Sequence, residues 1–145
     1  MGVFSLSNPM RRVVVTGLGI VSSIGNDANA VLESLRQQTS GIVFHEEYVE
    51  LGFRTNVHGS IKLKYDDLID RKIRRFMGDG AAYCYLAMKQ AVESINLSPD
   101  IISNPRTGLI VGSGGASTEH IVMMADLLRD RGIRKVGPYM VPRTM

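Results

Sequence analysis

Two short apolar runs, each ending in glycine, dominate the pattern of hydrophobic and polar positions along the chain. Residues 11–17 read Arg-Arg-Val-Val-Val-Thr-Gly, and residues 107–112 read Thr-Gly-Leu-Ile-Val-Gly. A continuous run of β-branched and aliphatic residues, without polar alternation, is typical of a strand that is buried on both faces. The pattern therefore predicts two core strands.

Between and after these runs, apolar residues recur at helical spacing. The segment 27–38 carries one apolar stripe and begins at Asn26 or Asp27, either of which can cap the N-terminus of a helix. The same spacing predicts three further helices, over residues 68–77, 79–95 and 118–131.

The order of these elements is β, α, loops, α, α, β, α, which indicates an α/β fold with helices on the faces of a parallel sheet. Residues 42–67 show no sustained period, and we expect loops and short strands there, for example over 55–61. The helix over 79–95 is apolar on most of its surface, which is typical of a buried helix. Because two strands cannot bury it, we expect the chain to be the front part of something larger.

Composition places the chain among ordinary soluble domains. Its 145 residues are 44% hydrophobic and 21% charged, and the formal net charge of +3 is too small to indicate nucleic acid binding. No apolar run approaches the ~20 residues that span a bilayer, so we expect no membrane segment. Residues 1–9 lack the features of a signal peptide, and we interpret them as a leader or cloning remnant before a domain over 10–145. The single cysteine, Cys84, excludes an internal disulfide and fits a cytoplasmic location.

Both glycine-rich turns raise the question of a phosphate site. A dinucleotide-binding fingerprint has glycine at its first, third and sixth positions. Gly17 and Gly19 fit the first two positions, but Ser22 stands at the sixth. In the second turn, Ser117 likewise stands at the sixth position in place of glycine. A nucleotide-binding domain therefore remains an alternative. The second turn is explained equally well as a wall of a ligand site or as a simple bend.

Few residues suggest catalysis. Cys84 lies within the apolar helix and has no neighbouring histidine or lysine to activate its thiol, so we interpret it as structural. His45, His58 and His120 are far apart in the sequence and lack metal-ligand spacing, so we interpret them as ordinary polar residues. The sequence predicts no catalytic set, no metal site and no cofactor.

The segment 70–77 shows the sharpest local charge pattern. At about 100° per residue, its apolar residues gather on one side of a helix. Four cations are expected on the other side: Arg71, Lys72, Arg74 and Arg75. An all-positive face suits an acidic macromolecule or a phosphate group, although a solvated face would look the same.

Four segments stand in an order and spacing that point to one family. They are residues 14–25 (VVTGLGIVSSIG), 70–77 (DRKIRRFM), 110–115 (IVGSGG) and 136–139 (VGPY). Together they resemble the N-terminal part of the bacterial β-ketoacyl-[acyl-carrier-protein] synthases. The resemblance covers residues 10–145, and it is greater to the elongating synthase I than to synthase II.

The resemblance implies a thiolase-like layered αβαβα fold, of which this chain is part of the N-terminal half, and a homodimer of the parent protein. Members of the family are acyltransferases of fatty acid synthesis. They condense a malonyl group on its carrier with an acyl chain held on a cysteine, and they release carbon dioxide. The catalytic cysteine and histidine motifs of the family would lie beyond Met145, so the resemblance implies that residues 1–145 are inactive alone.

The resemblance also assigns residues outside the chemistry. Five basic residues match positions that hold the acidic acyl carrier protein: Arg71, Lys72, Arg75, Arg131 and Arg134. Three residues match positions at the acyl tunnel, the last two near the dimer interface: Ala116, Val141 and Met145. A non-enzymatic module that only docks the carrier remains a further alternative.

Overall fold

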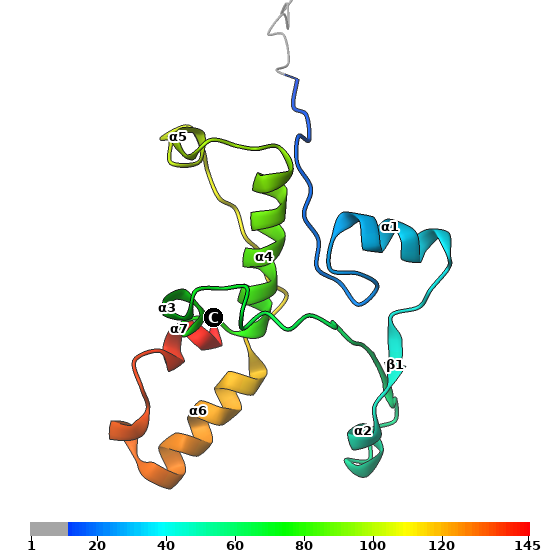
Figure 1. Cartoon of the computed structure of the whole chain (residues 1–145). Coiled ribbons are helices and arrows are strands. Elements are labelled where there is room, and N and C mark those ends of the chain that lie inside the picture. The colour runs from blue at the N-terminus through cyan, green and yellow to red at the C-terminus, as the bar shows by residue number, and fades with distance from the viewer. Residues whose placement is uncertain (1–11) are drawn as a thin grey trace, which may run out of the picture.

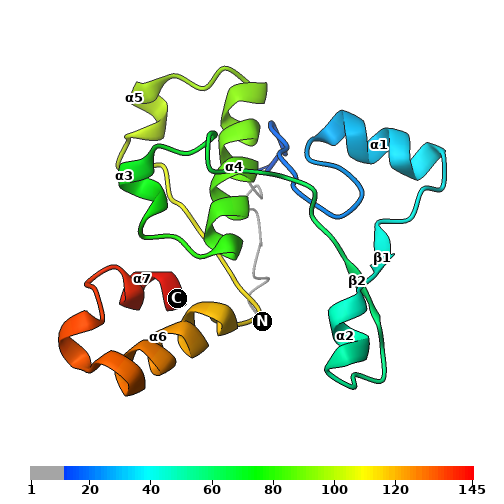
Figure 2. The ribbon, with the colours of Figure 1, turned by 60° about the horizontal axis from the view of Figure 1, so that its bottom comes forward.

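The computed structural model describes residues 12–145, so the interpretation of residues 1–9 and the start of the first predicted strand lie outside it. The chain folds around one long helix, α4 (Asp79–Ser94). One arm, with α1 and a small hairpin, lies to one side of α4, and a second arm, with α6 and α7, lies to the other (Figures 1 and 2).

The long helices form where the sequence predicts them. They are α1 (Ala28–Arg36), α4 and α6 (Thr118–Arg131). Asp27 caps α1, because its carboxylate accepts a hydrogen bond of 2.9 Å from the backbone N–H of Ala30. Gly132 ends α6 with a φ of 76°, a left-handed conformation that favours glycine.

Short elements connect and extend these helices. The helix expected over 68–77 contracts to a single turn, α3 (Arg71–Arg74). The other short elements are α2 (Glu46–Glu50), α5 (Pro99–Ile102), the 3₁₀ turn η1 (Ile133–Lys135) and α7 (Met140–Thr144).

The sheet differs from the predicted one. Among the described residues, the only sheet is an antiparallel hairpin of β1 (Ile42–Phe44) and β2 (Val57–Gly59), in which Val43 pairs with His58. The short strand expected within 55–61 is thus confirmed as β2. The prediction of a parallel sheet within these residues is wrong.

The two predicted core strands are extended but unpaired. Residues 12–20 and 107–113 form no regular strand, and Val13 and Ile110 are 94% and 96% exposed. A strand needs a neighbour that accepts and donates backbone hydrogen bonds, and neither segment has one among residues 12–145. The β-branched pattern of these segments is typical of buried strands, but residues 12–145 do not bury them.

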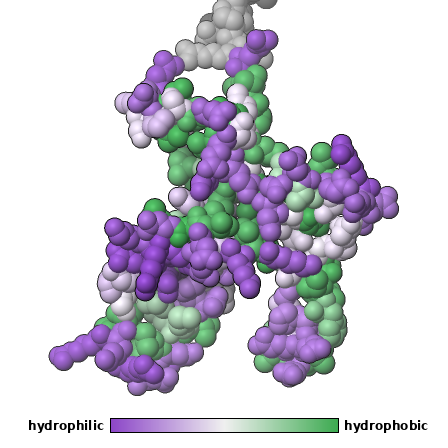
Figure 3. All heavy atoms as spheres, viewed as in Figure 1, coloured by the Kyte–Doolittle hydropathy of each residue, from purple (hydrophilic) through white to green (hydrophobic). Residues whose placement is uncertain are grey.

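The core is small and lies where α4 meets the segment before α3. Its buried residues are Tyr65, Ile69, Ala82 and Leu86. Ala82 and Leu86 are the only buried residues of α4, in line with the expectation that the strands predicted within these residues cannot bury this apolar helix. Hydrophobic side chains therefore reach the surface around α4 (Figure 3). None of the helices described here has the length and apolar character needed to cross a membrane.

Candidate functional site

The basic segment around α3 begins at Asp70. The carboxylate of Asp70 accepts a hydrogen bond of 2.7 Å from the backbone N–H of Lys72, and this cap starts the helix. Three basic side chains of the segment are exposed: Arg71, Lys72 and Arg75. Within residues 12–145, none of the three forms an ion pair with a carboxylate.

Arg74 departs from the predicted arrangement, because it points inward. One terminal nitrogen donates a 2.6 Å hydrogen bond to the hydroxyl of Tyr65, and the other donates to the carbonyl of Met77 at 2.7 Å. The guanidinium also lies 4.3 Å from the centre of the Tyr65 ring. The prediction that four cations share the outer face is therefore wrong, and three remain outside. Helical periodicity could not foresee this, because α3 is only one turn long.

Arg74 is part of a polar network at the N-terminus of α4. Its guanidinium lies within 3.9 Å of the carboxylate of Asp79 and within 3.7 Å of that of Asp66. The hydroxyl of Tyr65 donates a hydrogen bond to Asp79. Burial, together with this hydrogen bond and the charge of Asp79, raises the pKa of Tyr65. Burial also raises the pKa of Tyr83, whose ring meets that of Tyr65 edge-on. The network fixes α3 against α4.

Arg75 joins α3 to α7. Its guanidinium lies 4.7 Å from the ring centre of Tyr139 and 5.1 Å from that of Phe76, which is a stacking geometry between a cation and aromatic rings. The two rings meet edge-on at 5.0 Å. The Nε of Arg143 on α7 donates a 3.0 Å hydrogen bond to the carbonyl of Arg75. Two segments that are far apart in the sequence therefore form one surface.

The second basic cluster lies at the far end of α6. Arg131 is the last residue of α6, and Arg134 lies in η1. Both side chains are exposed, and within the described range neither forms an ion pair. No hydrogen bond or ion pair described here connects this cluster to α3.

A hollow of about 310 Å³ lies between the start of α4, the second glycine turn and the end of α7. Ala116 and Met145, both expected at an acyl tunnel, line it together with Cys84 and Ser117. Val141 is not among its lining residues and is 60% exposed. The structure therefore brings two of the three expected tunnel residues together.

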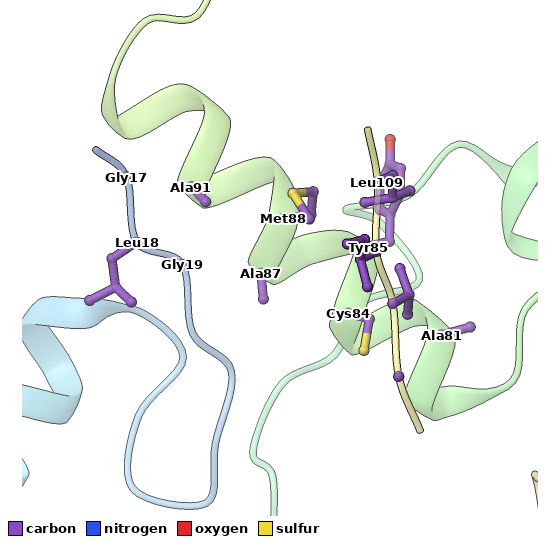
Figure 4. Close-up of a pocket in the computed structure, with 13 residues that line it drawn as sticks. Gly17, Leu18, Gly19, Ala81, Cys84, Tyr85, Ala87, Met88, Ala91 and Leu109 are labelled. Atoms are coloured by element: carbon purple, nitrogen blue, oxygen red, sulfur yellow. The ribbon is translucent and has the colours of Figure 1, made fainter. Parts of the chain in front are cut away.

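A larger apolar groove of about 620 Å³ lies along α4. Residues 17–19 line it on one side and residues 109–112 on the other, with Cys84 and Met88 of α4 between them (Figure 4). The expectation that Cys84 is packed inside a buried helix is wrong, because its side chain is exposed and lines both hollows.

The two glycine turns serve different purposes. A Cβ atom on Gly17 or Gly19 would collide with the carbonyl oxygens of Ala91 and Ala87, so these glycines allow the chain to lie directly against α4. The second turn is open, since a Cβ on Gly112 or Gly115 would meet nothing within 4 Å. Both of these glycines line the smaller hollow. The second turn is thus a wall, and the first is a packing contact with no space for a phosphate at these two glycines.

Two of the three histidines lie side by side, although they are far apart in the sequence. The hairpin places the rings of His45 and His58 4.7 Å apart, and the hydroxyl of Tyr48 lies 3.1 Å from the Nδ1 of His58. His120 is buried, with its Nδ1 2.8 Å from the Oγ of Ser117. Residues 12–145 contain no group of three or more His, Cys, Asp or Glu side chains that could hold a metal ion.

Sequence reasoning missed Tyr65, Asp79, Tyr139 and Arg143. The first two hold Arg74 inward, and the last two contact Arg75. For Tyr65 and Asp79, the only sequence signal was an aromatic and a carboxyl group near a dense run of basic residues, whereas Tyr139 and Arg143 lie far along the chain from that run.

The chain matches known proteins over nearly its whole length. Residues 10–145 match the model of the family described as beta-ketoacyl synthase, N-terminal domain. The chain is 51% identical over 138 residues to 3-oxoacyl-[acyl-carrier-protein] synthase 1 of Escherichia coli K12, and 49% identical over 137 residues to the protein of the same name from Haemophilus influenzae. Each match covers 94% of this chain but 34% of the relative, so the chain spans about a third of the length of these proteins.

Solved structures support the fold class. A beta-ketoacyl synthase from Burkholderia phymatum superposes with a TM-score of 0.79 at 23% identity, over 94% of this chain and 34% of that one. A ketosynthase in complex with its type II PKS acyl-carrier protein superposes with a TM-score of 0.70 at 22% identity, over 91% and 34%. The prediction of part of a thiolase-like α/β fold is therefore confirmed, although the strands expected within it are not paired here.

Proposed function

Because the chain belongs to the family of β-ketoacyl synthase N-terminal domains, we propose that it is the N-terminal part of a type I β-ketoacyl-[acyl-carrier-protein] synthase. The relatives from Escherichia coli K12 and Haemophilus influenzae, which are 51% and 49% identical to the chain, are both named synthase 1, and this supports the type. The parent enzyme would act in fatty acid synthesis in the cytoplasm, as a homodimer and without a cofactor.

In the proposed reaction, an acyl chain forms a thioester with a cysteine of the parent enzyme. The malonyl group on the carrier loses carbon dioxide, and the resulting carbanion attacks the acyl carbonyl carbon. The cysteine leaves as a thiolate, and the product remains on the carrier, two carbons longer. Cys84 does not fit the role of nucleophile, because it lies within α4 rather than at a helix N-terminus that would favour a thiolate.

We propose that this part of the enzyme receives the carrier. The observation that carries the proposal is the outer face of α3, where Arg71, Lys72 and Arg75 are exposed and form no ion pair in the described structure. Arg74 beside them is neutralised by Asp66 and Asp79. An uncompensated cluster of three cations suits an acidic protein, since complementary charge speeds encounter and excludes wrong partners. Arg131 and Arg134 would form a second contact.

The smaller hollow is the proposed part of the acyl tunnel in this chain. Its walls are the open glycine turn, Ala116 and Met145, and an extended acyl chain suits a hollow with small and apolar side chains. Val141 lies outside the hollow, and we propose that it contacts the second subunit of the parent enzyme.

The carrier proposal is tested by titrating a fluorescently labelled bacterial acyl carrier protein with the 145-residue chain. Replacing Arg71→Glu together with Arg75→Glu is expected to weaken binding by more than about tenfold, because the surface would then repel an acidic partner. Binding should also weaken as salt is added, since exposed charges are screened. Arg106→Glu is the matched control, because Arg106 is exposed on a different loop.

Two results would contradict the proposal. Equal carrier affinity of the double variant and the control would remove the docking role of α3. Tight and saturable binding of ATP or NAD would favour the alternative of a nucleotide-binding domain. We also expect no malonyl-dependent chain elongation by the 145-residue chain, and detectable elongation would show that the catalytic groups lie within it.

A further inference from the structure

The contact between α3 and α7 adds to the basic surface a cation that the sequence does not place there. Arg143 follows Arg75 by 68 positions, yet its Nε donates a 3.0 Å hydrogen bond to the carbonyl oxygen of Arg75. That bond uses one of the five N–H groups of the guanidinium. Among the described residues, no other partner binds the two terminal nitrogens of Arg143.

Backbone contacts hold α7 firmly in this place. The carbonyl oxygen of Arg143 would lie 2.8 Å from a Cβ atom on Gly78, so Gly78 permits the close approach of α7 to the start of α4. On the other side, the backbone N–H of Ser117 donates a 3.1 Å hydrogen bond to the carbonyl of Thr144. The position of Arg143 is therefore set by two separate parts of the fold.

The charges around this contact are uncompensated. α7 contains no acidic residue, and the carboxylate of Asp70, which precedes α3, already accepts the hydrogen bond that caps α3. The ion pairs found among residues 12–145 involve none of four cations of this surface: Arg71, Lys72, Arg75 and Arg143.

Aromatic side chains lie within this group of cations. Phe76 and Tyr139 are 41% and 36% exposed, and Arg75 stacks against both rings. Exposed tyrosine, phenylalanine and arginine side chains are enriched where proteins bind one another, because they offer large contact area and hydrogen bonds together. The surface thus combines a half-exposed aromatic pair with cations on more than one side.

We infer that α7 forms part of the carrier-docking surface, with Arg143 contacting an acidic side chain of the carrier and Tyr139 holding the guanidinium of Arg75 in place. This inference rests on the proposed function and extends it, since the surface then spans α3 and α7. The occupant is an acidic protein that presents an apolar side chain between its carboxylates. Met145, which directly follows α7, lines the smaller hollow, so the bound carrier lies next to the proposed acyl site.

The test compares carrier affinity of the 145-residue chain with Arg143→Gln, Arg143→Lys and the control Arg106→Gln, with circular dichroism to confirm that each variant is folded. Arg143→Gln is expected to weaken binding about two- to fivefold, the usual effect of one exposed charge pair. It should also reduce the dependence of affinity on salt. Arg143→Lys should restore most of the affinity, because it keeps the charge while losing the fork geometry.

The Lys variant separates charge from structure. If it binds as weakly as Arg143→Gln, the residue acts only through its hydrogen bond to Arg75, and the inference is overturned. An Arg143→Gln affinity equal to that of the unmodified chain overturns it as well. If Arg71→Glu with Arg75→Glu abolishes binding in that case, the proposed function survives without α7.

The role of Tyr139 is tested by a double-mutant comparison of carrier affinity, because a purely structural effect of Tyr139 would not depend on Arg75. Tyr139→Leu is expected to weaken carrier binding in the unmodified chain but to have little effect when Arg75→Gln is already present, because the tyrosine acts through that arginine. Equal losses in both backgrounds would contradict its positioning role.

Discussion

The corner where α3 meets α4 differs from the groove along α4 in how far its side chains find partners within the described residues. In the corner, Tyr65, Arg74 and Asp79 bond to one another and cover the small core. Along the groove, Ile110 and Val111 are 96% and 62% exposed, although they belong to one of the two apolar runs of the chain.

The difference follows from the kind of partner each region needs. A polar side-chain network can be completed within about fifteen residues of sequence, as from Tyr65 to Asp79. A core strand needs further strands beside it and layers on both faces, which come from distant sequence. The corner is therefore a local structure, whereas the two extended segments that line the groove pair with no strand among residues 12–145.

The largest expected difference between the regions is in the free energy of unfolding that is lost when an apolar side chain is replaced by alanine. Leu86 is 5% exposed in the core, and Leu86→Ala should lower the free energy of unfolding by about 2–5 kcal/mol, because it removes buried methyl groups and leaves a cavity. Ile110→Ala should change it by less than about 0.5 kcal/mol. Urea denaturation followed by circular dichroism measures both. An Ile110→Ala loss as large as that of Leu86→Ala would show that the groove is filled in solution.

A smaller effect is expected from the arginines of α3. Arg74→Met should destabilise the chain by about 1–3 kcal/mol, because the buried hydroxyl of Tyr65 and the carbonyl of Met77 each lose a charged donor. Arg71→Met, on the exposed face, should be within about 0.5 kcal/mol of the unmodified chain. The same denaturation experiment compares them, and equal stability of the two variants would show that the corner network does not hold α3.

The smallest expected effect is the contribution of Tyr65 to the pH dependence of stability. The folded state raises the pKa of Tyr65 above its ordinary value of 10.0, because burial and the charge of Asp79 disfavour the phenolate. The neutral hydroxyl is therefore favoured by folding, and this contribution is fully present below pH 10. It should be lost as the pH rises further, since the unfolded chain ionises first. Tyr65→Phe should make the alkaline fall in stability shallower than in the unmodified chain, as measured by urea denaturation at successive pH values.

Helices were the part of the fold that the sequence predicted well. The apolar stripes of α1 and α6 and the cap at Asp27 are local features, and local sequence also fixes their ends. The basic run of α3 was likewise visible, but the orientation of its individual members was not. Arg74 turns inward because Tyr65 and Asp79 lie beneath it, and only the fold brings those two residues there.

The remaining site features depend on contacts between distant segments. Three pairs of residues that meet in the structure are far apart in the sequence: His45 and His58, Arg75 and Arg143, and Ala116 and Met145. No sequence pattern indicates that the members of a pair lie close together. The hairpin, the packing of α7 and the smaller hollow bring them together. In the first glycine turn, the sequence raised the question of a phosphate site, whereas the structure shows that Gly17 and Gly19 allow the chain to lie against α4.

The sequence by itself determined the helices, the family and the presence of a basic segment, because helical periodicity, capping and motif order depend only on the order of residues along the chain. The tertiary structure alone decided which cations face outward, which residues share a hollow, and whether an apolar run becomes a strand. These outcomes depend on partners far along the chain, since hydrogen bonds between strands and the burial of side chains are completed only when distant segments meet.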